Sequence, residues 1–484
     1  ARQTIKAEKQ VRSTTAEAGM IQAERIKPLN NRGIIAGNPY VLYWMQSAQR
    51  AWCNHALEYA VRQANLTGKP LLVYVGVTED FPEGNARHYR FMLEGLKETA
   101  SVLKQRNIRL LVRRISPEKC ALALSKSAIV TVTDRGYLKV ERAWRDALAK
   151  GAACRTIQVE TNALVPVETA SGKEEYAAMA LRPKVARLMD TYARPLEETA
   201  VHHPSLGLSL PYEAFNIEDT GAALKALNLD NTVTPSPLTG GTSQAKRLLE
   251  TFISSKLAAY PDMKNVPGLE GSSALSSYLH FGQISPLAVL LAVKEAPEAA
   301  REAFLEELVV RRELGMNFAL YNGAYDTFDC LPSWAKATLD RHRGDRRPYL
   351  YSLEELEGAG THDGYWNAAQ AEMALAGRMN GYMRMYWGKK ILEWAKTPEE
   401  AFRRALYLNN RYSLDGRDPN SFAGVAWCFG KHDRPWKERE IFGTVRFMNA
   451  RGLERKFDMK HYLEKVAALS ARGGQGLPGA RRNG

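Results

Sequence analysis

The chain has 484 residues, of which 45% are hydrophobic and 25% are charged. This mixture is typical of globular proteins, and the length predicts roughly two to four domains. No run of about 18 apolar residues predicts a membrane span, and the first 20 residues lack the apolar core of a secretory signal. Five cysteines without CxxC spacing favour a reducing compartment and predict neither disulfides nor a metal site. We therefore expect a protein of the cytoplasm.

The charge is large and unevenly distributed. The chain has 67 Lys and Arg against 53 Asp and Glu, a net charge of +14. The last 113 positions, from Glu372 to Gly484, contain 22 basic and 12 acidic residues and therefore +10 of this surplus. A basic surface attracts polymers that carry phosphates. A basic face that serves only solubility is the alternative that charge alone leaves open.

In chain order, residues 1–34 are polar and alternate in charge, which predicts a mobile extension. Residues 35–165 contain apolar runs typical of buried strands, separated by helical patterns such as 48–65 and 86–106. This alternation predicts an α/β domain with a doubly wound, parallel, five-stranded sheet, although no GxGxxG motif marks a dinucleotide site. The predicted strands are 40–45, 70–77, 108–113, 128–133 and 156–160.

Beyond the predicted sheet the pattern changes twice. Residues 166–240 are rich in Pro, Gly and Ser, which predicts a long linker with one or two embedded helices. Residues 241–466 show helical periodicity and predict an all-α domain, and the Gly- and Arg-rich residues 467–484 predict a disordered tail.

Two segments of the helical part contain side chains suited to a polar ligand. The serine-rich turn at 271–285 precedes a helix, where N–H groups and hydroxyls bind anions such as phosphate. An ordinary serine N-cap is the alternative. The segment 408–427 crowds Asn, Asp and Arg side chains around an Asp-Gly turn. This density favours a polar ligand, with Asx capping as the alternative.

Two further helices combine aromatic or charged side chains with apolar neighbours. Trp387 and Trp394 are seven residues apart and therefore share one helix face. Core packing is the alternative, but the basic neighbours of Trp387 argue against it. Glu307 and Arg311 have the i, i+4 spacing of a surface ion pair. The apolar residues between them indicate partial burial, where a carboxylate needs a partner or a function.

These segments resemble the photolyase and cryptochrome superfamily, and most closely the class II cyclobutane pyrimidine dimer photolyases. The resemblance runs from about Gly37 to Lys465. It implies an N-terminal α/β domain, a long linker and an all-α domain that binds a U-shaped FAD. The motifs that carry it are SSALSSYLHFGQISP, ELVVRRELGMNF, THDGYWNAAQ, GYMRMYWGKKILEW, LNNRYSLDGRDPNSFAGVAW and HDRPWKERE.

The resemblance also implies which residues bind the cofactor. An ion pair near the isoalloxazine matches Arg384 and Asp415. The asparagine that class II proteins place near flavin N5 matches Asn409, and Asn420 is the second candidate because other classes place theirs there. The remaining implied FAD contacts are Tyr260, Ser272, Ser273, Leu275, Ser276 and Arg311.

The implied reaction is light-driven DNA repair. Excited, reduced flavin passes an electron to a pyrimidine dimer that is flipped out of double-stranded DNA, the cyclobutane bonds split, and the electron returns. Glu307 matches the carboxyl group that hydrogen-bonds the dimer, and Met385 and Trp427 match side chains of its pocket. Implied DNA contacts are Asp433, Arg434 and Trp436, and the implied electron-transfer chain from flavin to the surface is Trp387, Trp366 and Trp394.

Some properties stay open at this point. Val310 stands where class I photolyases and animal cryptochromes have a tryptophan, which favours class II. The resemblance allows a second, antenna chromophore, a folate or a deazaflavin, and no motif decides between them. We expect a monomer in the cytoplasm, associated with the nucleoid, or in the nucleus of a eukaryote. The alternatives are a cryptochrome-like photoreceptor without repair, a repair enzyme for the (6-4) photoproduct, and a flavin-independent nucleic-acid binder.

Overall fold

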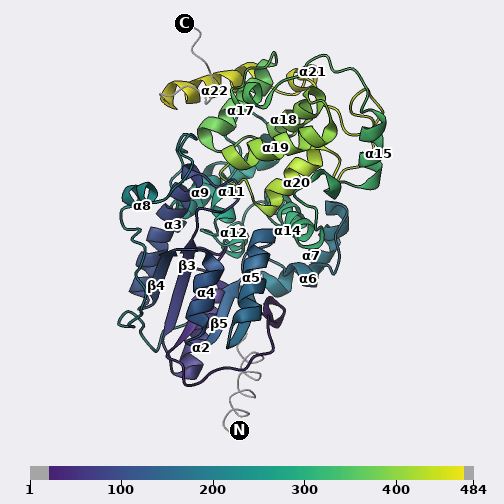
Figure 1. The fold of residues 1–484 in the computed structure, drawn as a ribbon. Helices are drawn as coiled ribbons and strands as arrows, with labels where there is room; N and C mark the ends of the chain where they lie inside the picture. Colours follow the sequence, from purple (N-terminus) through teal and green to yellow (C-terminus); the bar gives the residue numbers. More distant parts are fainter. Residues whose placement is uncertain (1–20, 474–484) are drawn as a thin grey trace.

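A six-stranded sheet forms the centre of the N-terminal α/β domain (Figure 1). The computed structural model describes residues 21–473. The strand order is β1-β6-β5-β2-β3-β4, in which β2 to β6 are parallel. The strands are β1 (Ile26–Pro28), β2 (Tyr40–Trp44), β3 (Leu71–Val77), β4 (Arg109–Arg114), β5 (Ala128–Asp134) and β6 (Arg155–Val159). The predicted parallel, five-stranded core of the sheet is therefore confirmed.

The sixth strand corrects the prediction for the N-terminal segment. Strand β1 pairs antiparallel with β6, so residues 21–34 belong to the α/β domain and are not part of a mobile extension. The buried guanidinium of Arg25 anchors this segment by donating to the carbonyl oxygens of Glu160 and Ala163 at 3.1 and 2.9 Å. A three-residue strand is too short to show an apolar period, so the sequence pattern missed it. The rest of the predicted extension, residues 1–20, lies outside the described residues.

Helices cover both faces of the sheet (Figure 1). Alternate residues of β2 point to opposite sides: Tyr43 packs in the core beneath α2 and α3, whereas Leu42 packs beneath α4 and α5. The predicted helix at 48–65 begins later, at His55, because the Asn54 side chain caps it by accepting from the Leu57 N–H. The covering helices are α2 (His55–Thr67), α3 (Ala86–Gln105), α4 (Pro117–Ser125) and α5 (Lys139–Gly151).

The segment between the two halves is packed rather than free. It contains α6 (Val167–Ala170), α7 (Ala178–Tyr192) and α8 (Thr220–Ala226), one helix more than expected. Its second half returns along the sheet, where the Phe215 N–H donates to the Val112 carbonyl at 2.8 Å. The predicted linker therefore also serves as a cover for the α/β domain.

The C-terminal half is helical, as expected. Helix α22 continues to Gly473, so the predicted disordered tail is wrong for residues 467–473, and its remainder lies outside the described residues. No helix between residues 21 and 473 is long and apolar enough to cross a membrane. The helices are α9 (Thr242–Ser255), α10 (Tyr260–Met263), α11 (Ser276–His280), α12 (Pro286–Ala292), α13 (Glu298–Leu305), the π-helix η3 (Glu306–Arg311), α14 (Arg312–Tyr321), α15 (Ser333–Arg341), α16 (Leu353–Glu357), α17 (Gly364–Ala376), α18 (Gly381–Trp394), α19 (Pro398–Tyr412), α20 (Pro419–Cys428), α21 (Ala450–Glu454) and α22 (Met459–Gly473).

Buried polar contacts join the two halves. Arg87 of α3 donates to the carbonyl oxygens of Met373 and Tyr412, at the ends of α17 and α19, at 3.3 and 2.6 Å. Gly282, just after the serine-rich turn, has φ +66°, and a Cβ there would lie 2.0 Å from the Ser47 carbonyl oxygen. Only glycine permits both the conformation and the approach. The serine-rich turn is thus attached directly to the α/β domain.

Candidate functional site

A π-helical turn follows α13 and begins with two consecutive carboxylates, Glu306 and Glu307. Leu308, Val309 and Val310 are buried, whereas the Glu307 side chain keeps 45% of its surface exposed. The predicted burial on this turn is therefore right for the apolar residues and wrong for the carboxylate. Single π-helical turns are rare and occur mostly at functional sites.

The π-helical turn also changes which ion pairs form. Arg311 donates to Glu306, five residues earlier, at 3.0 Å, and not to Glu307 as the i, i+4 spacing indicated. Glu306 also accepts from Arg182 at 2.9 Å. Burial alone would raise the pKa of Glu306, but the two guanidinium groups lower it. Glu307 is left with Lys264 as its ion-pair partner, at 2.8 Å.

Aromatic side chains border this pair of carboxylates. The Arg311 guanidinium lies 5.0 Å from the ring centre of Trp427, whose indole N–H is buried without a hydrogen-bond partner. Tyr260 is buried against Phe252 and Phe304, and burial together with the charge of Glu307 raises the pKa of its hydroxyl. Helices α10, η3 and α20 therefore bring Tyr260, Glu307, Arg311 and Trp427 to one place, the carboxylate mouth.

A second cluster joins α11, α18 and the turn after α19. Arg384 and Asp415 form the predicted ion pair at 3.5 Å, and the Ser413 hydroxyl donates to Asp415 at 2.6 Å. Burial would raise the pKa of Asp415, but Arg384 and hydrogen bonds from Ser413 and Ser276 lower it. The structure therefore places Ser276 and Arg384 around the half-buried, ionised carboxylate of Asp415.

The two asparagine candidates differ in burial. Asn409 is fully buried, and its amide donates to the Ser421 hydroxyl of α20 at 2.8 Å, while its side-chain oxygen has no hydrogen-bond partner among residues 21–473. An unpartnered buried oxygen is costly unless a ligand donates to it. Asn420 is exposed on the first turn of α20.

The remaining predicted cofactor residues are unevenly exposed. Ser272 is exposed and Ser273 is half-buried on the turn before α11, whereas Leu275 is buried at the start of this helix. The Leu275 N–H donates to the Ser273 hydroxyl at 3.4 Å. Met385, on α18, lies 4.0 Å from Cys428 of α20, sulfur to sulfur.

The three tryptophans form one continuous chain in the expected order. The rings of Trp387 and Trp366 are nearly parallel, 6.4 Å apart between centroids, and Trp366 and Trp394 are 5.5 Å apart. The expectation that this chain reaches the surface is wrong, because Trp394 is only 1% exposed. Its ring contacts His362 at 5.4 Å, and His362 stacks at 3.8 Å on Tyr349, which is 47% exposed.

The predicted DNA contacts lie together on the segment after α20. The Trp436 ring lies between the guanidinium groups of Arg434 and Arg446, at 5.1 and 5.0 Å. Asp433 accepts a hydrogen bond from the Trp436 indole at 3.3 Å. This arrangement combines an exposed aromatic ring with cations, as binding to nucleic acid requires.

Comparison with known proteins decides the family. A family model described as DNA photolyase matches residues 41–202. The deoxyribodipyrimidine photo-lyase of Methanothermobacter thermautotrophicus is 50% identical over 93% of this chain and 99% of its own, and that of Potorous tridactylus is 37% identical over 88% and 81%. The chain belongs to the deoxyribodipyrimidine photo-lyase family. The structure of an archaeal photolyase from Sulfolobus tokodaii with two FAD molecules has the same fold, with a TM-score of 0.66 and 14% identity over 91% of this chain and 95% of that one.

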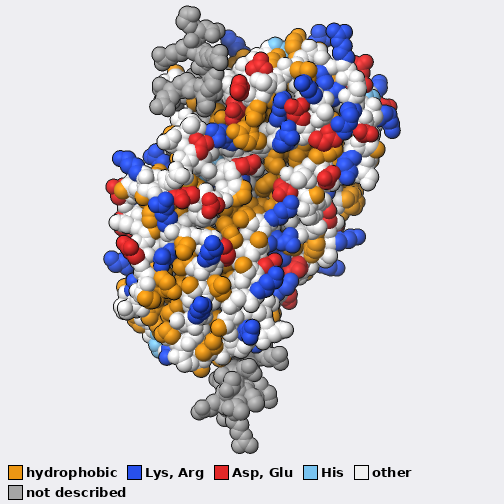
Figure 2. All heavy atoms as spheres, in the orientation of Figure 1, with side chains coloured by type: hydrophobic (Ala, Val, Ile, Leu, Met, Phe, Trp, Pro, Cys, Tyr) orange, Lys and Arg blue, Asp and Glu red, His pale blue; other side chains and the backbone are white. Residues whose placement is uncertain are grey.

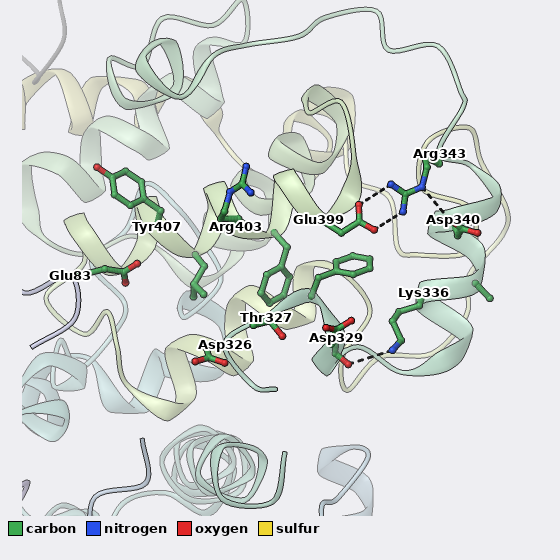
Figure 3. Close-up of a pocket in the computed structure, with 14 residues that line it drawn as sticks. Glu83, Asp326, Thr327, Asp329, Lys336, Asp340, Arg343, Glu399, Arg403 and Tyr407 are labelled. Atoms are coloured by element: carbon green, nitrogen blue, oxygen red, sulfur yellow. Dashed lines mark hydrogen bonds and ion pairs between the residues drawn. The ribbon is translucent and has the colours of Figure 1, made fainter. Parts of the chain in front are cut away.

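Two cavities of this photo-lyase lie outside the clusters described above. Figure 2 shows apolar side chains along the middle of the face that carries α19 and α20. A cavity of about 870 Å³ between η4 (Phe328–Cys330), α15 and α19 contains none of the predicted site residues (Figure 3). Arg343 in the wall of this cavity pairs with Glu399 and Asp340, so these charged side chains neutralise one another. A second, narrower crevice lies between the two halves, beside the carboxyl ends of the parallel strands.

Sequence reasoning missed several residues of these clusters. Lys264 pairs with Glu307 from a segment 43 positions away, Arg446 covers Trp436, and Ser421 holds Asn409. Gln370 accepts from the indole of Trp387 at 2.9 Å. The sequence offered a signal for two of them, because Ser421 directly follows Asn420 and Lys264 is four positions after Tyr260.

Proposed function

We propose that this photo-lyase repairs cyclobutane pyrimidine dimers in double-stranded DNA by light-driven electron transfer, as a class II enzyme. Family membership makes the protein a light-dependent DNA repair enzyme. The observation that carries the residue assignments is the carboxylate mouth, where the exposed Glu307 adjoins Arg311 and Trp427. A carboxyl group beside an aromatic surface suits a planar, hydrogen-bonding pyrimidine pair.

The residues below the mouth fit a flavin. The orphaned oxygen of Asn409 suits a ring N–H donor, and the Arg384–Asp415 pair provides opposite charges for the polar edge of an isoalloxazine. Ser272, exposed on the turn before α11, suits a phosphate oxygen. Bound there, reduced FAD would supply the photoexcited electron that splits the dimer. Of the two asparagines, burial favours Asn409 over Asn420 as the residue near the flavin ring.

The protein's own groups then have separate tasks. When it carries a proton, the carboxyl group of Glu307 donates a hydrogen bond to the dimer and stabilises the negative charge that develops there. Trp427 and Met385 enclose the apolar face of the dimer and exclude water. Asp433, Arg434 and Trp436 hold the DNA that surrounds the flipped-out pair. Trp387, Trp366 and Trp394 relay electrons for photoreduction of the resting cofactor, which restores the active state and is distinct from repair.

The crevice between the two halves is where we place an antenna chromophore. It is lined by Phe81 and Trp144, whose rings are 6.0 Å apart, and by the buried Arg417. Within the described part of the chain, two guanidinium nitrogens of Arg417 have no hydrogen-bond partner, which is costly unless a ligand accepts from them. A folate and a deazaflavin both offer oxygen acceptors, so the choice between them stays open. Loss of non-flavin absorbance from Arg417→Met protein would support this placement, and unchanged absorbance would contradict it.

Repair of a thymine dimer in an oligonucleotide tests the proposed function. We expect purified protein with reduced flavin to split the dimer into two thymines only under near-ultraviolet or blue light. Bound and photoreducible flavin without repair would favour the cryptochrome-like photoreceptor, and repair confined to the (6-4) photoproduct would favour that lesion. Protein without bound flavin would favour a plain nucleic-acid binder. The cytoplasm or nucleus and the monomeric state stay predictions.

A further inference from the structure

Two large apolar side chains stand out on the segment that leads into α7. Tyr176 is 68% exposed and Met179 is 66% exposed, the highest values for large hydrophobic residues between positions 21 and 473. Each exposes apolar surface to water, which costs free energy that burial of the side chain would recover. Their spacing of three residues places them on neighbouring parts of one surface, the Tyr176–Met179 patch.

The backbone beneath this patch is held in place. The Glu175 N–H donates to the Asn317 side chain at 2.7 Å, and the Asn317 amide donates to the Lys173 carbonyl at 2.9 Å. On the other side, Nδ1 of His432 lies 3.1 Å from the Tyr176 carbonyl oxygen. Burial lowers the pKa of His432 to about 4, although this hydrogen bond opposes the shift, so the ring is neutral and donates from Nδ1 at pH 7. The side chains are therefore exposed from a fixed segment.

The patch lies between the carboxylate mouth and the predicted DNA contacts. One turn beyond Met179, Arg182 donates to Glu306, which in turn accepts from Arg311 beside Trp427. His432, which binds the Tyr176 carbonyl, is followed directly by Asp433 and Arg434. The same segment thus reaches both groups.

The charge around the patch is complementary to DNA. The carboxylates of Glu174 and Glu175 are neutralised by Lys431 and Lys184. Three cations near the patch form no ion pair with any described residue: Lys173, Arg187 and Arg434. Exposed apolar side chains within a cationic surround suit bases that have lost their stacking partners next to a phosphate backbone.

We propose that Tyr176 and Met179 contact the lesion-containing duplex, where they pack against bases left unstacked when the pyrimidine dimer flips out. This inference rests on the proposed function and adds two residues of the interdomain segment to the DNA-binding surface. The two side chains serve duplex recognition and have no part in the photochemistry. Removing them should therefore weaken binding of a duplex and leave the repair of a free dinucleotide dimer unchanged.

Binding and repair by the flavin-loaded protein test this proposal. Tyr176→Ala with Met179→Ala should weaken binding of a dimer-containing duplex by about 5- to 150-fold, equivalent to about 1–3 kcal/mol of base stacking. Light-driven repair of an isolated dinucleotide dimer should stay unchanged. Tyr176→Phe keeps the ring and should bind like the parent, and Leu66→Ala, a change of a 47% exposed residue on α2, is the matched control.

A measurement on the unaltered protein complements the variants. Dimer-containing duplex should protect the Met179 sulfur from peroxide oxidation, followed by mass spectrometry, more than undamaged duplex does. Parent-like duplex affinity of the double variant, or equal oxidation of Met179 with and without DNA, would overturn the proposal. So would an equal loss of dinucleotide repair, which indicates a general structural defect. Absence of light-driven repair by the parent protein would instead refute the proposed function.

Discussion

Replacing Glu307 with alanine separates repair from stability. The carboxylate is 45% exposed and pairs with Lys264, and exposed ion pairs contribute about 0–1 kcal/mol. Flavin content and the thermal midpoint should therefore stay near those of the parent protein. A hydrogen bond to a charged group contributes about 1.5–3 kcal/mol. If Glu307 stabilises the charged dimer, its loss should slow repair by about 10- to 150-fold at 1.4 kcal/mol per factor of ten.

The assay is single-turnover repair of a bound dimer with chemically reduced flavin under constant illumination, so that neither DNA affinity nor photoreduction limits the rate. Glu302→Ala, which removes an exposed carboxylate on α13 just before the π-helical turn, is the control and should repair like the parent. Loss of flavin in proportion to the loss of repair would show that Glu307 supports the cofactor site. An unchanged repair rate would refute its assignment to the dimer.

Three further predictions follow from the geometry. Trp366→Phe removes the ring between Trp387 and Trp394, so photoreduction of oxidised flavin should be lost while chemically reduced protein still repairs; photoreduction at the parent rate would show another route. Arg446→Gln should reduce the salt dependence of DNA binding by about one counterion, whereas an unchanged slope would remove Arg446 from the DNA surface. Burial raises the pKa of Glu313 to about 7, against the backbone N–H groups and Arg312 that lower it, so its protonated form favours folding and its contribution is lost as pH rises from about 4.5 to 7. The parent should lose about 3 kcal/mol more stability over this range than Glu313→Gln, measured by thermal unfolding, and parallel pH profiles would contradict this.

Local patterns predicted the α/β core well because buried parallel strands are short apolar runs separated by helices. The strand β1 was missed because three residues show no period, and its position depends on buried hydrogen bonds from Arg25 to a distant segment. The start of α2 was displaced because Asn54 caps the helix, a contact that periodicity does not reveal.

The candidate site was predictable only where motifs are continuous in the sequence. The motifs around Glu307, Trp387 and Asn409 indicated a family and thereby a set of residues. The partner of Glu307 was not predictable, because in the π-helical turn Arg311 pairs with Glu306, and Glu307 pairs with the distant Lys264. Rules that assume 3.6 residues per turn predict contacts between residues three or four apart and miss the contact over five residues in a π-helical turn.

The sequence by itself determined the fold class, the family and the side chains available for chemistry, since strand and helix patterns and the order of motifs are properties of the chain. The tertiary structure decided which of these side chains meet. It joined Ser276, Arg384 and Asp415 from three segments, buried the end of the tryptophan chain, and brought Tyr176 beside His432 from 256 positions away. These contacts follow from the packing of distant helices, which no local pattern encodes.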